Sequence, residues 1–192
     1  MEVNDVVKAL LVDKEDLGRM LDRMSRQIVE RLDPQEGDDA HALVGMQTRG
    51  VHLARRLQER IRRFESVDMP LGVLDATMYR DDYRRGRIRP VVKVTDIPFD
   101  VTGKHIVLVD DVLYTGRTVR AALDALMDMG RPASVLCLVV IDRGHHELPI
   151  QADIVGRVVP TMPGEEVRVR LSEIDDREGV WLVEHRRDEP SE

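Results

Sequence analysis

Apolar residues recur along the chain in two alternating patterns, one typical of buried strands and one typical of amphipathic helices. The clearest pair lies at mid-chain, where the short β-branched run 105–109 is followed, after a polar loop, by a helical pattern over 117–129. Gly130 comes next, at a position where helices commonly end. A strand that leads into a helix through a short loop places that loop at the carboxyl end of a parallel sheet. Because ligands bind at this edge in open α/β folds, we expect a ligand site in the loop.

The same alternation continues on both sides of this unit. The periodicity predicts two further helices, from Asp13 or Lys14 to Leu32 and from Val51 to about Phe64. The predicted strands and extended segments span residues 42–46, 71–77, 135–142 and 152–159, and residues 167–171 and 180–183 are predicted to form a terminal hairpin. The fold class is therefore α/β, with a mainly parallel central sheet flanked by helices.

Composition supports one domain over residues 1–192. Hydrophobic residues make up 42% of the chain and charged residues 34%, which allows a substantial core. The sequence contains neither an apolar run near the ~18 residues that span a bilayer nor a signal-peptide pattern, so we expect a cytoplasmic protein without a membrane partner. Cys137 is the only cysteine and lies in an apolar run, which indicates a core thiol. The net charge of −7 argues mildly against nucleic acid, although a local basic face is compatible with it.

The loop after the central strand has the residue types of a phosphate site. Backbone N–H groups of 114–118 lie at a predicted helix N-terminus, which attracts anions, and Thr115 and Thr118 add hydroxyls. Asp110 and Asp111 can serve the same ligand only if the strand ends there. Two carboxylates beside a phosphate cradle suit a phosphorylated sugar with Mg²⁺. A pair of solvated aspartates before a capped helix is the alternative, and the Thr-Gly-x-Thr sequence favours the functional interpretation.

Three other polar segments have an ordinary and a functional interpretation. Residues 47–50, between a strand and a helix, form either a plain turn or a second anion site. The arginine-rich segment 78–89 is either a solvated loop or a cationic lid that closes over a leaving group. Three arginines spaced along the polar face of the first helix are typical of a solvated face (Arg19, Arg23, Arg26). Vicinal His145 and His146 do not form a convincing metal site.

The segment 107–118, VLVDDVLYTGRT, resembles the phosphoribosyl-pyrophosphate (PRPP) motif of type I phosphoribosyltransferases. The sequence of residues 110–118 is similar to one branch of this family, the PyrR family of pyrimidine-operon attenuators that also have uracil phosphoribosyltransferase activity. Other segments similar to this branch occur in the same order, at 47–50, 77–82, 130–132, 142–145 and 147–149. The resemblance covers roughly residues 6–184. A purine phosphoribosyltransferase would share the PRPP motif but would not be expected to share the sequences of the other segments.

This resemblance implies a type I phosphoribosyltransferase fold with a lid at about 78–90 and a small C-terminal β hood at about 143–184. It implies an enzyme that makes UMP and pyrophosphate from uracil and PRPP with Mg²⁺, and no side chain is assigned as a direct metal ligand. The implied catalytic residues are Asp110, Asp111, Arg80 and Arg49. The implied PRPP- and nucleotide-binding residues are Thr48, Arg49, Gly50, Asp110, Asp111, Val112, Leu113, Tyr114, Thr115, Gly116, Arg117 and Thr118. The implied uracil-binding residues are Arg143, Val159 and Pro160.

The resemblance also implies a homo-oligomer that binds leader mRNA under the control of UMP or UTP. The RNA-binding candidates are Arg19, Arg23, Arg26 and His146. The chain departs from the family at this surface, because His146 and Gln151 stand where arginines are common, and Asp22 adds a negative charge. Losing about two phosphate contacts weakens RNA binding by one to two orders of magnitude. The alternative is therefore a uracil phosphoribosyltransferase with weak or lost RNA regulation.

Overall fold

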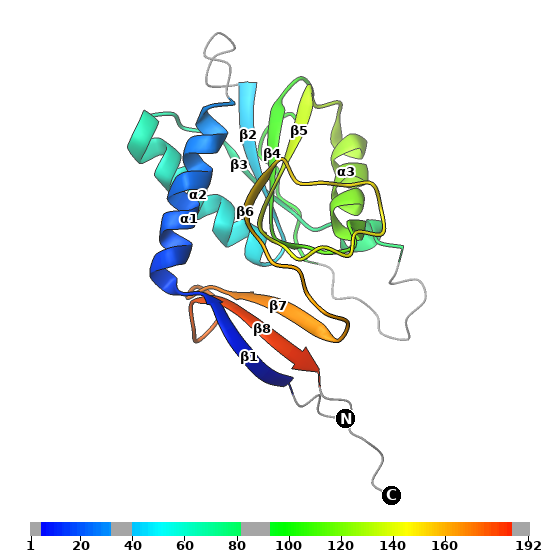
Figure 1. Ribbon diagram of the computed structural model, residues 1–192. Helices are drawn as coiled ribbons and strands as arrows, with labels where there is room; N and C mark the ends of the chain where they lie inside the picture. Colours follow the sequence, from blue (N-terminus) through cyan, green and yellow to red (C-terminus); the bar gives the residue numbers. More distant parts are fainter. Residues whose placement is uncertain (1–4, 32–39, 82–92, 186–192) are drawn as a thin grey trace, which may run out of the picture.

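The computed structural model describes residues 5–31, 40–81 and 93–185, and its centre is a five-stranded parallel sheet (Figure 1). The strand order in this sheet is β3-β2-β4-β5-β6. The strands are β2 (His41–Met46), β3 (Leu71–Leu74), β4 (His105–Leu113), β5 (Ser134–Asp142) and β6 (Ile154–Val158). The predicted mainly parallel α/β sheet is confirmed.

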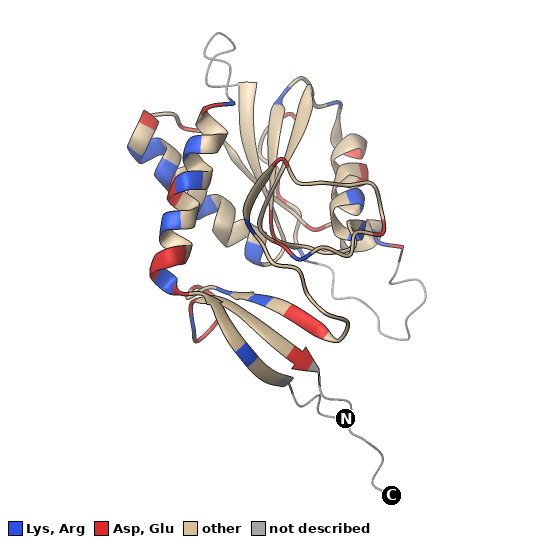
Figure 2. Cartoon of the chain, in the orientation of Figure 1, with Lys and Arg blue, Asp and Glu red and all other residues tan. Residues whose placement is uncertain are grey.

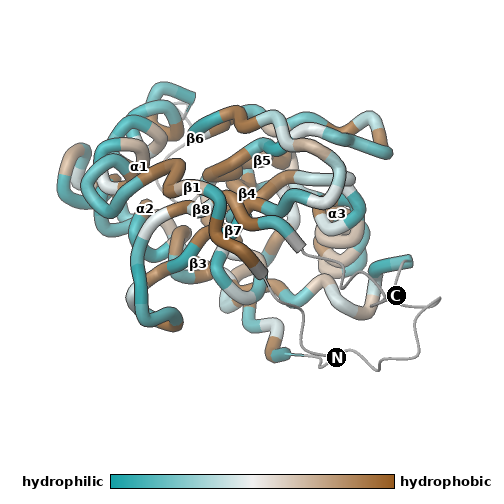
Figure 3. Tube along the Cα trace, turned by 60° about the horizontal axis from the view of Figure 1, so that its bottom comes forward, coloured by the Kyte–Doolittle hydropathy of each residue, from teal (hydrophilic) through white to brown (hydrophobic). Residues whose placement is uncertain are grey.

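Helices cover both faces of this sheet. On one face, α1 (Lys14–Val29) and α2 (Arg49–Glu65) pack against Val107 and Val109 of β4, while α3 (Arg117–Met129) packs on the other face against Ile106 and Leu108. Successive residues of the central strand thus enter different cores, which explains why its sequence is continuously apolar. Figure 3 shows the apolar residues concentrated on the central strands and the polar residues on the outer turns of α1 and α2.

The helix boundaries follow the sequence signals closely. Asp13 caps α1, with its carboxylate accepting a hydrogen bond of 2.8 Å from the backbone of Asp16. The helix ends at Val29 with Glu30 as its C-cap, so the predicted end at Leu32 is wrong by three residues. Gly116 caps the start of α3 and Gly130 its end, so the predicted span 117–129 is confirmed.

A second, three-stranded antiparallel sheet lies beyond the carboxyl ends of the central strands (Figure 1). Its order is β1-β8-β7, built from β1 (Asp5–Val12), β7 (Glu165–Arg170) and β8 (Gly179–His185). The predicted terminal hairpin is confirmed as β7 and β8. β1, which is not among the predicted elements, pairs with β8, so both ends of the chain build this small sheet. We call this three-stranded sheet the hood. Of the segment predicted as a hood, about 143–184, it contains β7 and β8, whereas β6 belongs to the central sheet.

Strands β3 and β4 end three or more residues from the predicted positions, and local hydrogen bonds explain both. Strand β4 pairs with β2 only as far as Val109, but it continues beside β5 to Leu113. Strand β3 ends at Leu74 because the carboxylate of Asp75 accepts hydrogen bonds from the backbone and hydroxyl of Thr77. A short 3-10 helix, η2 (Thr77–Tyr79), follows. Residues 82–92, most of the predicted lid, lie outside the described residues. Among the described helices, none has the length and apolar character needed to cross a membrane.

Candidate functional site

The loop between β4 and α3 forms the expected cradle at a helix N-terminus. Gly116 adopts a φ of 86°, a conformation that glycine takes without strain, and it turns the chain into α3. The carbonyl oxygen of Thr115 accepts hydrogen bonds from the backbones of Glu147 (3.0 Å) and Leu148 (3.2 Å). A Cβ at Gly116 would meet Ile150 at 3.3 Å. The cradle therefore rests directly on the loop that follows β5.

Asp110 and Asp111 lie at the point where β2 no longer pairs with β4. Asp110 is only 8% exposed, and its carboxylate accepts a hydrogen bond of 2.9 Å from the backbone of Asp111, whose carboxylate in turn accepts one from Val112. Burial, together with the negative charge of Asp111, raises the pKa of Asp110 well above its usual value. Burial also raises the pKa of Asp111, against the opposing charge of Arg49. A buried carboxylate next to a second, half-buried one is costly for folding, which is typical of a functional site.

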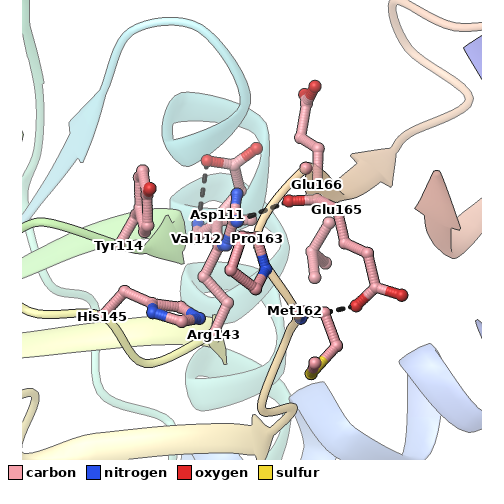
Figure 4. Close-up of a pocket in the computed structure, with 11 residues that line it drawn as sticks. Asp111, Val112, Tyr114, Arg143, His145, Met162, Pro163, Glu165 and Glu166 are labelled. Carbon is pink, nitrogen blue, oxygen red and sulfur yellow. Dashed lines mark hydrogen bonds between the residues drawn. The ribbon is translucent and has the colours of Figure 1, made fainter. Parts of the chain in front are cut away.

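A cavity of about 780 Å³ opens between this carboxylate pair and the hood (Figure 4). Its lining comes from the end of β4, from the start of the loop after β5, and from the segment that leads into β7: Asp111, Val112, Tyr114, Arg143, His145 and residues 162–167. Arg143 is buried, and its guanidinium lies 4.0 Å from the centre of the Tyr114 ring and donates to the carbonyl oxygen of Glu165 (2.5 Å). Val159 and Pro160, predicted with Arg143 to bind uracil, are not among the lining residues.

The second predicted anion loop, residues 48–50, lies at the N-terminus of α2. A Cβ at Gly50 would overlap the carbonyl oxygen of Val109, so only glycine lets this helix approach β4 closely. The side chain of Arg49 makes two hydrogen bonds to Asp175 in the loop between β7 and β8, at 2.8 and 3.2 Å. A smaller cavity of about 270 Å³, lined by Arg49, Asp111 and side chains of β7, adjoins the larger one. The hydroxyl of Thr48 accepts a hydrogen bond from Lys93.

Arg80 and Asp81, at the start of the predicted lid, contact the first residues of α3. Arg80 donates a hydrogen bond of 3.1 Å to the hydroxyl of Thr118, and its positive charge acts on Asp110. Arg117 makes ion pairs with Asp81 (2.7 Å) and with Glu147 (2.8 Å). The structure thus brings the predicted Arg80, carboxylate pair and cradle together at one end of the sheet.

The predicted RNA-binding arginines lie apart from this cavity, on α1. Arg19 and Arg23 line a separate cavity of about 320 Å³ with Arg157 of β6, a basic residue that the sequence analysis did not single out. Arg26 lies over the ring of Phe64, 5.2 Å from its centre. His146 is on the loop after β5, and its ring nitrogen Nε2 lies 2.9 Å from a carboxylate oxygen of Asp142.

The expected repulsion of RNA by Asp22 needs correction. Asp22 accepts a hydrogen bond of 2.8 Å from Arg60 of α2, and Arg63 lies 3.8 Å away, so arginines of the neighbouring helix neutralise much of its charge. Figure 2 shows basic residues next to acidic ones along α1 and α2.

Two features of the site carry no sequence motif. Glu165 lines the larger cavity and pairs with Lys8 of β1 at 2.7 Å, an interaction between residues at opposite ends of the chain. Asp175 belongs to a loop whose sequence resembles an ordinary polar turn. Strand pairing alone brings both carboxylates to the site, so neither could be identified before the hood was known.

The residues present fit a magnesium ion that arrives with PRPP. No group of three or more His, Cys, Asp or Glu side chains gathers as a metal site within the described ranges. Mg²⁺ binds through one or two carboxylates together with substrate phosphates, and Asp111, which lines the cavity next to the buried Asp110, is in a position to supply one.

Comparison with known proteins identifies the family. Residues 11–173 match the phosphoribosyl transferase domain family. The bifunctional protein PyrR of Pelotomaculum thermopropionicum is 53% identical over 177 residues, covering 92% of this chain and 96% of that protein. The bifunctional protein PyrR of Thermus thermophilus is 52% identical, with the same coverage of both chains.

Solved structures confirm the fold at much lower identity. A hypoxanthine phosphoribosyltransferase from Staphylococcus aureus has a TM-score of 0.67 at 17% identity, covering 94% of this chain and 93% of that one. A hypoxanthine phosphoribosyltransferase from Trypanosoma cruzi has a TM-score of 0.69 at 16% identity, covering 92% and 95%. The chain therefore belongs to the phosphoribosyltransferase family and, within it, to the PyrR proteins.

Proposed function

We propose that this protein transfers the phosphoribosyl group of PRPP to uracil and releases pyrophosphate. The observation that carries the proposal is the junction at the end of β4, where the loop at the N-terminus of α3 and the carboxylate pair, through Asp111, meet a cavity of about 780 Å³. A ribose 5-phosphate placed there would put its phosphate at the amides of 114–118 and its hydroxyls toward Asp111. The rest of the cavity, beside Arg143, would take the base.

In the reaction, the bond between the anomeric carbon and the pyrophosphate oxygen breaks, and the oxygen keeps the electron pair. A ring nitrogen of uracil releases its proton to water and bonds to that carbon, which carries positive charge in the transition state. Asp111 would hold the ribose hydroxyls near this charge, while Arg49 and Arg80 would stabilise the negative charge on the leaving group. Mg²⁺, which phosphoribosyltransferases generally use with PRPP, would neutralise further charge on the pyrophosphate when held by Asp110 and Asp111.

We expect uracil-dependent release of pyrophosphate from PRPP in the presence of Mg²⁺. Hypoxanthine is the matched control, because a purine enzyme of the same fold would use the same cradle and cavity. Release with hypoxanthine but not with uracil would reverse the base assignment. No release with either base at saturating PRPP would contradict the proposed reaction.

We also propose that the protein binds leader RNA under the control of UMP. Relatives about 50% identical over nearly the whole chain are named bifunctional, which favours this over the alternative of lost regulation. Arg19, Arg23 and Arg157 line one cavity and supply cations for phosphates, with Arg19 shared with Asp16 at 2.5 Å. Arginines on α2 offset the charge of Asp22. The loop after β5 supports the cradle through Thr115 and presents His146 outward, so nucleotide binding and RNA binding would share this loop.

Adding two cations to this loop, as His146→Arg with Gln151→Arg, is expected to tighten RNA binding. Two added phosphate contacts should steepen the dependence of log affinity on log salt by about two. The measurement is RNA affinity across a salt series, with and without UMP. Replacing Arg131, an exposed residue after α3, with alanine is the control and should change neither quantity. An unchanged slope in the double variant would mean that RNA does not contact this loop.

A further inference from the structure

The loop between β7 and β8 supplies a fixed carboxylate to the arginine of the α2 anion loop. Asp175 accepts from Nε and Nη2 of Arg49, at 3.2 and 2.8 Å, in a two-bond arrangement that sets both the position and the plane of the guanidinium. The two residues are 126 positions apart in sequence. An arginine on a short loop otherwise samples many side-chain conformations, so such a contact determines where its charge lies.

Asp175 is itself held rigidly. Its carboxylate accepts a hydrogen bond of 2.9 Å from the backbone of Leu171, and its own N–H donates to the carbonyl oxygen of Leu171 at 2.7 Å. Its side chain is 10% exposed. Although burial opposes it, the hydrogen bond from Arg49 and that from Leu171 lower the pKa of Asp175, so the carboxylate stays charged at neutral pH.

The position in which Arg49 is held is suited to an anion. Arg49 and Asp111 line the smaller cavity together with Arg168 and Arg170, and this cavity adjoins the one assigned to the nucleotide. A guanidinium has five N–H donors, and Asp175 occupies two of them, which leaves the others for phosphoryl oxygens. Electrostatic stabilisation is most effective when the donor is in place before the charge develops.

We infer that Asp175 is a positioning residue for the reaction, because it fixes the guanidinium of Arg49 where the pyrophosphate of PRPP binds. The inference rests on the proposed function, and it makes the hood part of the arrangement that binds the leaving group. The opposite role is an inhibitory one, in which Arg49 must leave Asp175 before it can bind pyrophosphate. The two roles predict opposite changes in the affinity for PRPP when Asp175 is replaced.

Asp175→Asn is expected to weaken binding of PRPP, measured by calorimetry with Mg²⁺, by about tenfold. Affinity for UMP should stay within about twofold, because UMP has no pyrophosphate for Arg49 to hold. Losing a negative charge would by itself favour an anion, so weaker binding reports the loss of positioning and not a simple charge effect. Arg49→Ala should weaken PRPP binding as well, and adding Asp175→Asn to it should cause little further loss.

Asp176→Asn is the matched control. Asp176 also lies 3.9 Å from Arg170, as Asp175 does, but it is 78% exposed and forms ion pairs with Arg170 and Arg177. We expect it to leave both affinities within about twofold of the wild type.

PRPP binding by Asp175→Asn that is as tight as wild type or tighter would overturn the inference. Equal weakening of PRPP and UMP, or equal weakening by Asp176→Asn, would also overturn it. A wild-type protein that binds PRPP but does not consume uracil would refute the proposed base alone, since the PRPP affinities still decide the role of Asp175.

Discussion

Replacing Arg80 with alanine is expected to lower kcat by about 100-fold or more, while UMP affinity changes much less. Arg80 bonds to Thr118 of the cradle and acts electrostatically on Asp110, so it lies between the phosphate site and the carboxylate pair. Its charge is most valuable when pyrophosphate leaves, whereas UMP contains no pyrophosphate. The measurement is steady-state turnover of PRPP and uracil, with UMP binding followed by calorimetry.

Arg120→Ala is the control for a purely structural effect of Arg80. Arg120 lies on α3 and holds the same 3-10 turn, since it donates a hydrogen bond of 2.9 Å to the carbonyl oxygen of Tyr79. If Arg80 acted only by fixing this turn, Arg120→Ala would reproduce most of the loss. We expect the Arg120 variant to keep turnover within about fivefold of the wild type. An Arg80 variant with normal turnover would remove its proposed role.

The central sheet was predictable because its inner strands β2, β4 and β5 are buried over most of their length and each crossover helix has one apolar stripe. Residues 106–109 enter two different cores, and α3 begins and ends at glycines, so the periodicity and the caps agree. The hood was less predictable. Its β7–β8 hairpin alternates visibly, but β1 becomes a strand only by pairing with β8 from the opposite end of the chain. A pattern within eight residues does not contain that pairing.

The site divides in the same way. The geometry of the loop at 114–118 was predictable because a strand, a glycine turn and a helix N-terminus are consecutive in sequence. Residues that act through tertiary contacts were not predictable. Asp175 reaches Arg49 only because the hood folds over the end of the sheet. The pairing of Asp22 was not predictable for the same reason, since its partner Arg60 is on another helix.

The carboxylate pair is expected to lower the stability of the fold at neutral pH. Burial and the charge of Asp111 raise the pKa of Asp110, so the folded state holds a proton on this side chain more tightly than the unfolded chain does. Such a group favours folding below the usual pKa of an aspartate, and that contribution is lost as pH rises through its raised folded-state value. At neutral pH the pair therefore destabilises the fold, and removing one charge should relieve the strain on the other.

Asp110→Asn is thus expected to raise the melting temperature at neutral pH by about 2–4 °C, equivalent to about 1 kcal/mol for a chain of this size. The same substitution should lower kcat/KM for PRPP by about 100-fold. Asparagine can still accept the hydrogen bond from the backbone of Asp111, so the local geometry is retained. The gain in melting temperature should shrink as pH falls through the raised pKa of Asp110 and vanish below the usual pKa range of aspartate.

Asp153→Asn is the control, because this exposed aspartate accepts a hydrogen bond from the backbone of Cys137 away from the cavity and should show no gain. Thermal unfolding from pH 4 to 8, with turnover measured in parallel, tests both effects. An Asp110 variant that is less stable than the wild type at neutral pH would show that the pair supports the fold and is not a cost borne for function.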